Sequence, residues 1–122
     1  MKKKITIAID AMGGDNSPDK TIEGVRIFLN KYKSLDDFEL KLYGDKNKIQ
    51  EKLVQYKVSN KFVNIIHTKS VVADNETPLT AIKNSKNTSM WNCIKSQVEG
   101  GSDISLSAGN TGVLLVVSRM IL

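Results

Sequence analysis

The loop Ser107-Ala108-Gly109-Asn110-Thr111-Gly112 decides how this sequence folds, because it joins a short apolar segment to a strongly apolar helical one. Its glycines allow a ligand to approach the backbone closely, and Asn110 and Thr111 add side chains that form hydrogen bonds. The helical segment begins at Val113, so the loop stands at a helix N-terminus, where free N–H groups and the helix dipole favour an anion. The sequence therefore predicts a strand-to-helix loop that can hold a phosphate group.

A second loop of the same kind lies near the N-terminus. The stretch Asp10-Ala11-Met12-Gly13-Gly14-Asp15-Asn16-Ser17-Pro18 follows the apolar segment 5–9 and precedes another helical pattern. Both loops thus stand between a strand and a helix. We expect them to form one site.

Apolar strand patterns alternate with helical patterns along the chain. Strands are expected at 5–9, 38–43, 63–67 and 103–107, with helices between and after them, in the order β-α-β-α-β-α-α-β-α. This alternation predicts an α/β fold with a parallel sheet, right-handed crossovers and helices on both faces. In such folds ligands bind beyond the carboxyl ends of the strands, where the strand order reverses. Both glycine loops are expected at that edge.

Local signals predict where the helices start. Pro18 suits a first helical position with Asn16 or Ser17 as the cap, Asp45 can cap the second helix, and Thr77 precedes Pro78 in the same way. Thr88 or Ser89 can begin the next helix, which carries Met90, Ile94 and Val98 at intervals of four and ends at Gly100-Gly101. In the second strand, Phe38, Leu40 and Leu42 alternate with Glu39, Lys41 and Tyr43, so one face of that strand is expected to be more exposed.

Composition limits the possible functions. The 122 residues carry 18 Lys and Arg against 13 Asp and Glu, a net charge of +5, but the only arginines are Arg26 and Arg119. Proteins that read nucleic acid rely more on clustered arginine, so we expect no nucleic-acid partner. A basic surface still attracts an acidic protein or a phosphorylated small molecule. The single Cys93 rules out an internal disulfide and a thiolate zinc site, and it favours a reducing, cytoplasmic location.

The chain is expected to be one piece of a single larger α/β enzyme, with residues 1–122 as its N-terminal portion and no internal domain boundary. The last helical pattern reaches Leu122 without a glycine or charge cluster that would stop it. The apolar segment after the basic N-terminal residues is too short for a signal peptide, so none is expected. The longest apolar run is interrupted by Ser118 and Arg119, so no membrane-spanning helix is expected.

Neither loop matches a common phosphate motif by itself. The segment 107–112 lacks the lysine of a P-loop and the spacing of the dinucleotide fingerprint, and Asp10-Ala11-Met12 lacks the second aspartate of a phosphoaspartyl phosphatase. Gly13-Gly14 is faintly similar to the first phosphate loop of sugar and acetate kinases. No cluster of carboxylates or histidines calls for a metal, and no cofactor is expected.

Together, however, the segments 7–15, 78–90 and 107–112 resemble the bacterial phosphate acyltransferases of phospholipid synthesis, also called acyl-carrier-protein phosphate acyltransferases. The resemblance implies a Rossmann-like fold, similar to that of phosphotransacetylase and isocitrate dehydrogenase, of which this chain is the first third. It implies transfer of a long acyl chain from acyl carrier protein to inorganic phosphate, and a membrane acyltransferase that passes the acyl group to glycerol 3-phosphate. It also implies a cytoplasmic homodimer with peripheral membrane association.

The resemblance also assigns site residues. Those given a catalytic role are Asn110, Thr111 and Asp10. Those expected to bind phosphate or substrate are Gly13, Gly14, Asn16, Lys83, Lys86, Ser107, Gly109 and Gly112. The residues 109–112 would form the phosphate or oxyanion cradle, with Ser107 at its entry. Asp10 or Asn16 would orient donors, and the two lysines, three apart on one helical face, would add positive charge.

Other interpretations remain open at this stage. Gly13 and Gly14 can serve a turn, Asp10 can cap that turn, and the two lysines can form a solvated face. His67 is interpreted as a partly buried structural residue and not as a base. The protein could instead be a phosphotransacetylase-like or kinase-like enzyme acting on a smaller substrate, or a non-catalytic module that binds phosphate or a carrier protein. If the cradle is catalytic, Asn110→Ala should lower activity far more than stability.

Overall fold

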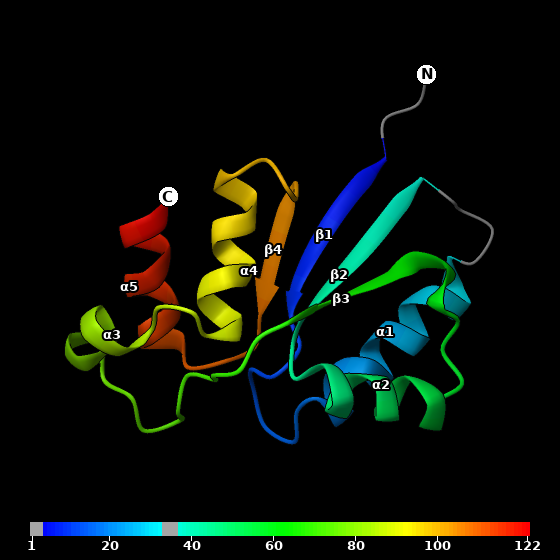
Figure 1. Ribbon diagram of the computed structural model, residues 1–122, viewed down its shortest axis with the longest axis horizontal. Coiled ribbons are helices and arrows are strands. Elements are labelled where there is room, and N and C mark those ends of the chain that lie inside the picture. The colour runs from blue at the N-terminus through cyan, green and yellow to red at the C-terminus, as the bar shows by residue number, and fades with distance from the viewer. Residues whose placement is uncertain (1–3, 33–36) are drawn as a thin grey trace.

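The computed structural model describes residues 4–32 and 37–122. Its strands are β1 (Ile5–Asp10), β2 (Phe38–Gly44), β3 (Val63–His67) and β4 (Ile104–Ser107). Its α-helices are α1 (Asp19–Lys31), α2 (Lys46–Gln55), α3 (Pro78–Asn84), α4 (Ser89–Val98) and α5 (Thr111–Ile121), and a 3-10 turn, η1 (Asn60–Phe62), precedes β3. The predicted alternation of strands and helices is confirmed (Figure 1).

The four strands form one parallel sheet in the order β3-β2-β1-β4. From β1 the chain moves outward to β2 and then β3, and it later returns to place β4 on the other side of β1. The strand order therefore reverses between β1 and β4, which is where ligands bind in open α/β sheets. The loops that follow these two strands are the two glycine loops identified in the sequence.

Helices cover both faces of the sheet, as predicted (Figure 1). On one face, α1 and α2 bury Ile22 and Ile49 against Leu40 and Leu42 of β2. On the other face, α4 lies across β4, β1 and β2. Helices can pack on both faces because neighbouring residues of a strand point to opposite faces of the sheet. A strand that is apolar along its whole length therefore offers an apolar surface to each face.

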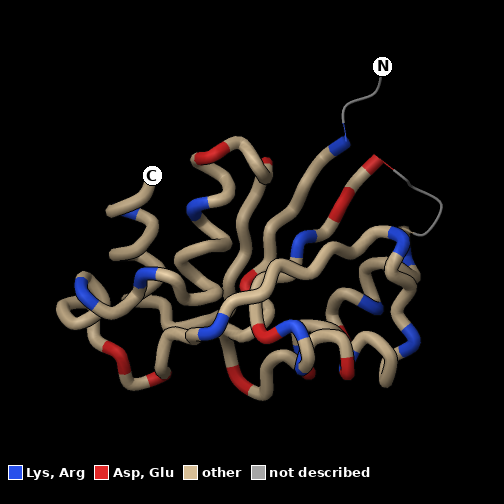
Figure 2. The backbone as a smooth tube through the Cα atoms, in the orientation of Figure 1, with Lys and Arg blue, Asp and Glu red and all other residues tan. Residues whose placement is uncertain are grey.

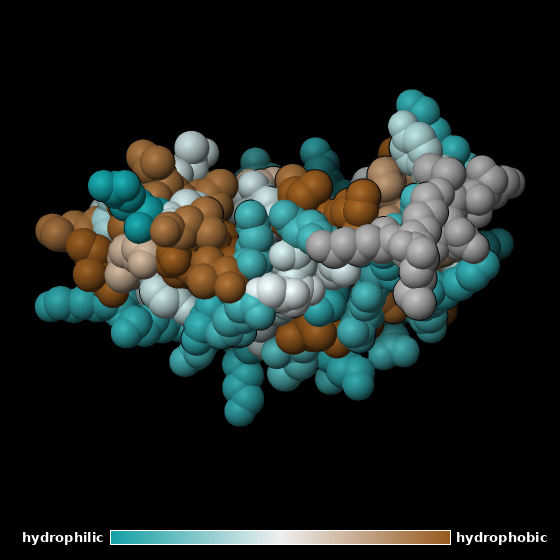
Figure 3. Space-filling view, turned by 90° about the horizontal axis from the view of Figure 1, so that it is seen from above, coloured by the Kyte–Doolittle hydropathy of each residue, from teal (hydrophilic) through white to brown (hydrophobic). Residues whose placement is uncertain are grey.

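The helices α3 and α5 form an outer layer on α4. Ala81, Met90, Ile94, Val113 and Val117 make a second core there. Several apolar side chains at this end remain exposed, and Figure 3 shows hydrophobic surface gathered over it. They include Leu79, Ile82, Leu115, Met120 and Leu122.

The expectation that β2 is more exposed on one face is wrong at its carboxyl end. Tyr43 is buried against Ala8 and Cys93, beneath α4. This burial raises the pKa of the Tyr43 hydroxyl, because the phenolate would lose its hydration there. Lys41, on the same face, donates a hydrogen bond of 2.8 Å to the carbonyl of Gly101.

Most helix starts are as predicted. The side chains of Asp45, Thr77 and Thr88 accept hydrogen bonds from the amides three residues later, and Thr77 forms a full capping box with Thr80. The first helix is the exception. It begins at Asp19 after Pro18, and neither Asn16 nor Ser17 caps it, because the Ser17 hydroxyl donates to the carbonyl of Gly13 instead.

Charged residues are distributed over the whole described surface. Figure 2 shows lysine and arginine on helices and loops at both ends of the molecule, and not along a single helix. None of the helices in residues 4–32 and 37–122 has the length and apolarity that crossing a membrane requires.

Candidate functional site

One buried carboxylate, that of Asp10, connects the two glycine loops. Asp10 ends β1 and is 3% exposed. Its Oδ1 accepts hydrogen bonds from the amides of Met12 and Gly13, at 3.2 and 3.1 Å, and from the Ser89 hydroxyl at 2.6 Å. Its Oδ2 accepts one from the Ser107 hydroxyl at 2.7 Å. Because a buried carboxylate needs such donors to remain stable, these contacts tie both loops to one group.

The fold explains why these donors meet at Asp10. In the parallel ladder between β1 and β4, Asp10 is paired with Ser107, so both side chains lie on the same face of the sheet. That face carries α4, whose first residue is Ser89. The positive end of the α4 dipole therefore faces a negative group, which stabilises the arrangement.

The two loops pack against each other through backbone. A Cβ atom added at Gly13 would lie 2.5 Å from Asp10 Oδ2 and 3.0 Å from the amide nitrogen of Gly109. Gly14 has a φ of +93°, and a Cβ there would lie 3.0 Å from the carbonyl oxygen of Ala108. Glycine is thus required at both positions so that the loops can approach each other. The space that their missing side chains leave is filled by protein, and close approach of a ligand at these glycines stays a prediction.

The glycines of the second loop likewise allow neighbouring segments to approach the loop closely. A Cβ at Gly109 would lie 2.9 Å from Met90 Cε, and one at Gly112 would lie 3.1 Å from Pro78 Cγ. The amide of Gly109 also donates to the Ser107 hydroxyl at 3.1 Å. The three family-like segments of the sequence therefore lie side by side at the start of α5.

Asn110 holds the second loop in place with both ends of its amide. Its Oδ1 accepts a hydrogen bond from the amide of Val113 and so caps α5. Its Nδ2 donates to the carbonyls of Glu76 at 2.7 Å and Asp74 at 3.2 Å. Thr111 is the first residue of α5 and is exposed. The first amides of a helix have no partner inside the helix, so Thr111 and Gly112 present donors at this N-terminus.

Two open hollows adjoin the loops. One, of about 330 Å³, is lined by Gly13, Gly14, Asp15, Ser17, Lys20, Thr21 and Ala108. The other, of about 310 Å³, is lined by Ile9, Asp10, Lys20, Thr21, Gly24, Leu106, Ser107 and Ala108. They share Lys20, Thr21 and Ala108, so the two hollows lie next to each other along the loops.

Sequence analysis missed three residues of this region: Ser89, Lys20 and Thr21. Ser89 was considered only as a helix start, and nothing in the sequence shows that it meets Asp10, 79 positions away. A local signal existed for the other two. Lys20 and Thr21 follow Ser17 at spacings of three and four, shortly after the Gly13-Gly14 pair and at the expected start of a helix.

Of the two predicted lysines, Lys83 lies on α3, and the binding of phosphate by either of them stays a prediction. The helix α3 ends at Asn84, so Lys86 lies beyond it, and the expectation that it shares a helical face with Lys83 is wrong. Both lysines are exposed, and neither lines the hollows beside Ala108. Asn16 is also exposed and has a φ of +57°, a conformation that asparagine tolerates better than most residues.

His67 and Cys93 have structural surroundings. The expectation that His67 is partly buried is wrong, because it is exposed, and its Nδ1 accepts a hydrogen bond from the amide of Lys46 at the start of α2. Cys93 is fully buried on α4, and burial, assisted by the nearby charge of Asp10, raises the pKa of its thiol to about 12. Such a thiol stays protonated at neutral pH and cannot act as a thiolate nucleophile. Among the described residues, no group of three or more His, Cys, Asp and Glu could hold a metal ion.

The fold and the site define an α/β protein with a parallel sheet whose switch point, the place where such folds bind ligands, carries two interlocked glycine loops and a helix N-terminus. Comparison with known proteins identifies the family. The family model described as fatty acid synthesis protein matches residues 5–122.

Curated relatives named phosphate acyltransferase match nearly the whole chain. The one from Pelagibacter ubique (strain HTCC1062) is 49% identical over 120 residues, which are 98% of this chain and 34% of that protein. The one from Streptococcus uberis is 46% identical over 121 residues, 99% of this chain and 33% of that protein. The one from Streptococcus pneumoniae (strain Hungary19A-6) is 43% identical, with 99% and 34% covered.

The chain therefore belongs to the fatty acid synthesis protein family. Its curated relatives described above are named as transferases. It spans about a third of the length of those relatives and corresponds to an N-terminal part of them. The resemblance inferred from three short segments is confirmed.

Proposed function

We propose that this chain forms part of an enzyme that transfers a long acyl chain from the thioester of acyl carrier protein to inorganic phosphate. The observation that carries the proposal is the Asp10 carboxylate, which holds both glycine loops together beside the N-terminus of α5. The name of the relatives, phosphate acyltransferase, supports the reaction class.

The chemistry needs phosphate to be held and aimed. A phosphate oxygen attacks the thioester carbonyl carbon, and the carbonyl oxygen becomes an oxyanion. The carbon–sulfur bond then breaks, the pantetheine thiolate leaves and takes a proton, and an acyl phosphate remains. Preorganised N–H donors stabilise both the phosphate and the oxyanion, and such donors contribute the largest part of catalysis in acyl transfer.

The described residues divide this work. The amides of Thr111 and Gly112, at the start of α5, donate to phosphate or to the oxyanion, and the exposed Thr111 hydroxyl adds a further donor. Asp10, Ser107 and Asn110 position the loops that carry those amides through their hydrogen bonds. Lys20, which lines both hollows, supplies positive charge that the sequence-based proposal assigned to Lys83 and Lys86.

The partners proposed for the whole protein follow from this reaction. Acyl carrier protein is acidic and would be attracted to the basic surface of this chain, whose net charge is +5. The acyl phosphate would pass to a membrane acyltransferase that acylates glycerol 3-phosphate in phospholipid synthesis. The enzyme would act as a cytoplasmic homodimer that associates peripherally with the membrane.

A turnover assay tests the proposal. A protein of the relatives' length that carries this segment is incubated with acyl-acyl carrier protein and labelled phosphate, and the expected product is an acyl phosphate that reacts with hydroxylamine. Asp10→Asn should abolish the product. Turnover of acetyl-coenzyme A, or of nucleotide with acetate, in place of the long-chain substrate would identify an enzyme for a smaller substrate. Binding of phosphate or carrier protein by a folded protein without turnover would identify a binding module.

A further inference from the structure

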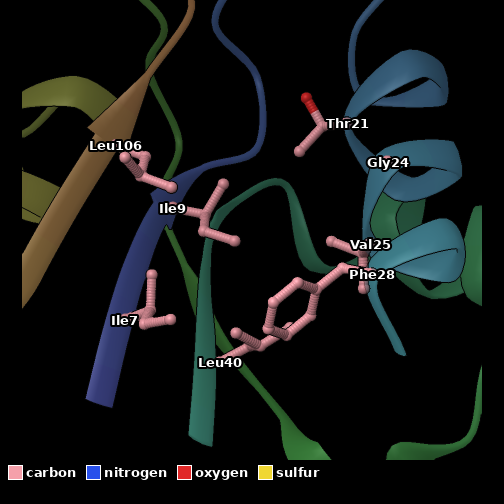
Figure 4. Close-up of a pocket in the computed structure, with 8 residues that line it drawn as sticks. All are labelled: Ile7, Ile9, Thr21, Gly24, Val25, Phe28, Leu40 and Leu106. Atoms are coloured by element: carbon pink, nitrogen blue, oxygen red, sulfur yellow. The ribbon is translucent and has the colours of Figure 1, made fainter. Parts of the chain in front are cut away.

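An apolar groove runs along the sheet face that carries α1. Its volume is about 230 Å³, and it lies between Ile7, Ile9 and Leu106 of the sheet and Gly24, Val25 and Phe28 of α1. Figure 4 shows the sheet residues on one side and the α1 residues on the other, pointing into the same space.

The groove exists because α1 covers only part of this face. Ile104 and Leu106 of β4, which lie beside Ile7 and Ile9 of β1, are 47% and 53% exposed. Gly24 widens the opening on the helix side, since it has no side chain and an added Cβ atom there would meet nothing within 4 Å. A glycine in the middle of a helix weakens that helix, so the space comes at a cost in stability.

The groove continues into the candidate site. It shares Ile9, Thr21, Gly24 and Leu106 with the hollow beside Asp10, and that hollow shares Thr21 with the hollow at the glycine loops. One end of this path therefore carries Lys20 beside the polar residues Asp15 and Ser17, and the other end is lined by apolar side chains. This distribution suits a linear molecule with an anionic head and a hydrocarbon tail.

We propose that the groove binds the acyl chain of the substrate, with the reacting carbonyl near Ser107 and Ala108 and the tail directed toward Phe28. The inference rests on the proposed function. It adds where the acyl chain lies and identifies Phe28 as the residue that limits the length of the acyl chain. Each methylene group buried in the groove should strengthen binding about fourfold.

The test uses a series of n-alkyl phosphates, from butyl to hexadecyl, titrated calorimetrically below their micelle concentrations into the protein of the relatives' length. Affinity should rise with chain length in the parent protein. Gly24→Leu fills the groove from the helix side, so it should remove this rise of affinity with chain length. The matched control, Asn30→Leu, adds a similar side chain at an exposed position of the same helix outside the groove and should keep the rise.

Two results would overturn the groove proposal while leaving the proposed function intact. One is equal affinity for all chain lengths in the parent protein that still forms acyl phosphate. The other is loss of folding in Gly24→Leu at the full length, seen as a lost thermal transition, because it would mean that another part of the polypeptide occupies the groove. Photolabelling with an alkyl phosphate that carries a terminal diazirine gives an independent readout, and the labelled peptide should contain Phe28.

Discussion

The Ser107 hydroxyl donates a hydrogen bond of 2.7 Å to Asp10 Oδ2, across 97 positions of sequence. The bond links the ends of β1 and β4, the two strands between which the sheet order reverses. Since the carboxylate is buried, the loss of the Ser107 hydroxyl removes a hydrogen-bond donor from a charged acceptor that water reaches poorly.

Ser107→Ala should therefore lower the free energy of unfolding by about 1.5–3 kcal/mol, the range for a hydrogen bond to a charged group. Urea unfolding of the 122-residue chain measures this change. In a double-mutant cycle with Asp10→Asn, the two effects should be strongly non-additive, because the groups share one contact. Simple additivity would mean that the bond does not link the loops.

Gly13→Ala and Gly24→Ala should have opposite effects on stability. At Gly13 the new methyl group would meet Asp10 Oδ2 and the amide of Gly109, so the loops must separate and the chain is destabilised. At Gly24 the methyl group meets nothing and replaces a helical glycine, which should add about 0.4–1 kcal/mol. Thermal melting of both variants provides the comparison, and a stable Gly13→Ala chain would contradict the loop contact.

Asn110→Ala should lower stability as well as activity, which revises the expectation from sequence. The variant loses the cap of α5, worth about 1 kcal/mol, and also the bonds to the carbonyls of Asp74 and Glu76. Asn110→Ser keeps a capping oxygen and loses only those two bonds. In urea unfolding, its free energy of unfolding should therefore exceed that of Asn110→Ala by about the contribution of the cap. Equal destabilisation by both variants would show that the cap contributes nothing.

Cys93 should resist alkylation in the folded chain. Because burial raises the pKa of its thiol to about 12, from an ordinary value of 9.0, the fraction of thiolate near pH 8 falls about a thousandfold. Iodoacetamide should therefore label the native chain far more slowly than the chain in urea, followed by mass spectrometry. Similar rates in the two states would mean that α4 opens readily from the sheet.

Asp19 should make stability depend on acidic pH. Its pKa lies below 3.8 because Lys52, at 3.0 Å, and the Tyr56 hydroxyl, at 2.8 Å, both favour the ionised form. A lowered pKa in the folded state stabilises the chain above the unfolded value, and this contribution disappears as pH falls through the folded value. Asp19→Asn should thus lower the urea midpoint near neutral pH, and this effect should shrink as the pH falls through the folded-state pKa. Glu51→Gln, on the exposed face of α2, is the matched control and should show no such change.

Local features of the fold could be predicted from sequence. The strand and helix order follows from apolar periodicity, and the caps at Asp45, Thr77 and Thr88 follow from side-chain chemistry within one turn. The burial of Tyr43 could not be predicted, because it depends on α4, which lies far along the chain. The same holds for Ser17, whose hydroxyl bonds to Gly13 in place of capping α1.

The site was predicted as two loops, and the structure adds what joins them. Sequence placed Asp10 and Ser107 at strand ends, where parallel strands bring their side chains to one edge. It could not show that Ser89 completes the set of donors or that the glycines face each other, since these contacts depend on the packing of α4 and on the loop conformations. The sequence also could not show how far Lys83 lies from the carboxyl edge of the sheet, so its distance from the two loops could not be predicted.

The position of β1 in the middle of the sheet has a consequence for protein synthesis. The ribosome makes β1 first, but its neighbour β4 emerges only after about a hundred further residues, and the donors Ser89 and Ser107 emerge with α4 and β4. Before Ser89 and Ser107 are made, Asp10 can have only local donors such as the amides of Met12 and Gly13, and the first glycine loop lacks its partner loop. A nascent chain that has not yet reached Ser107 therefore cannot contain the complete set of contacts of the candidate site.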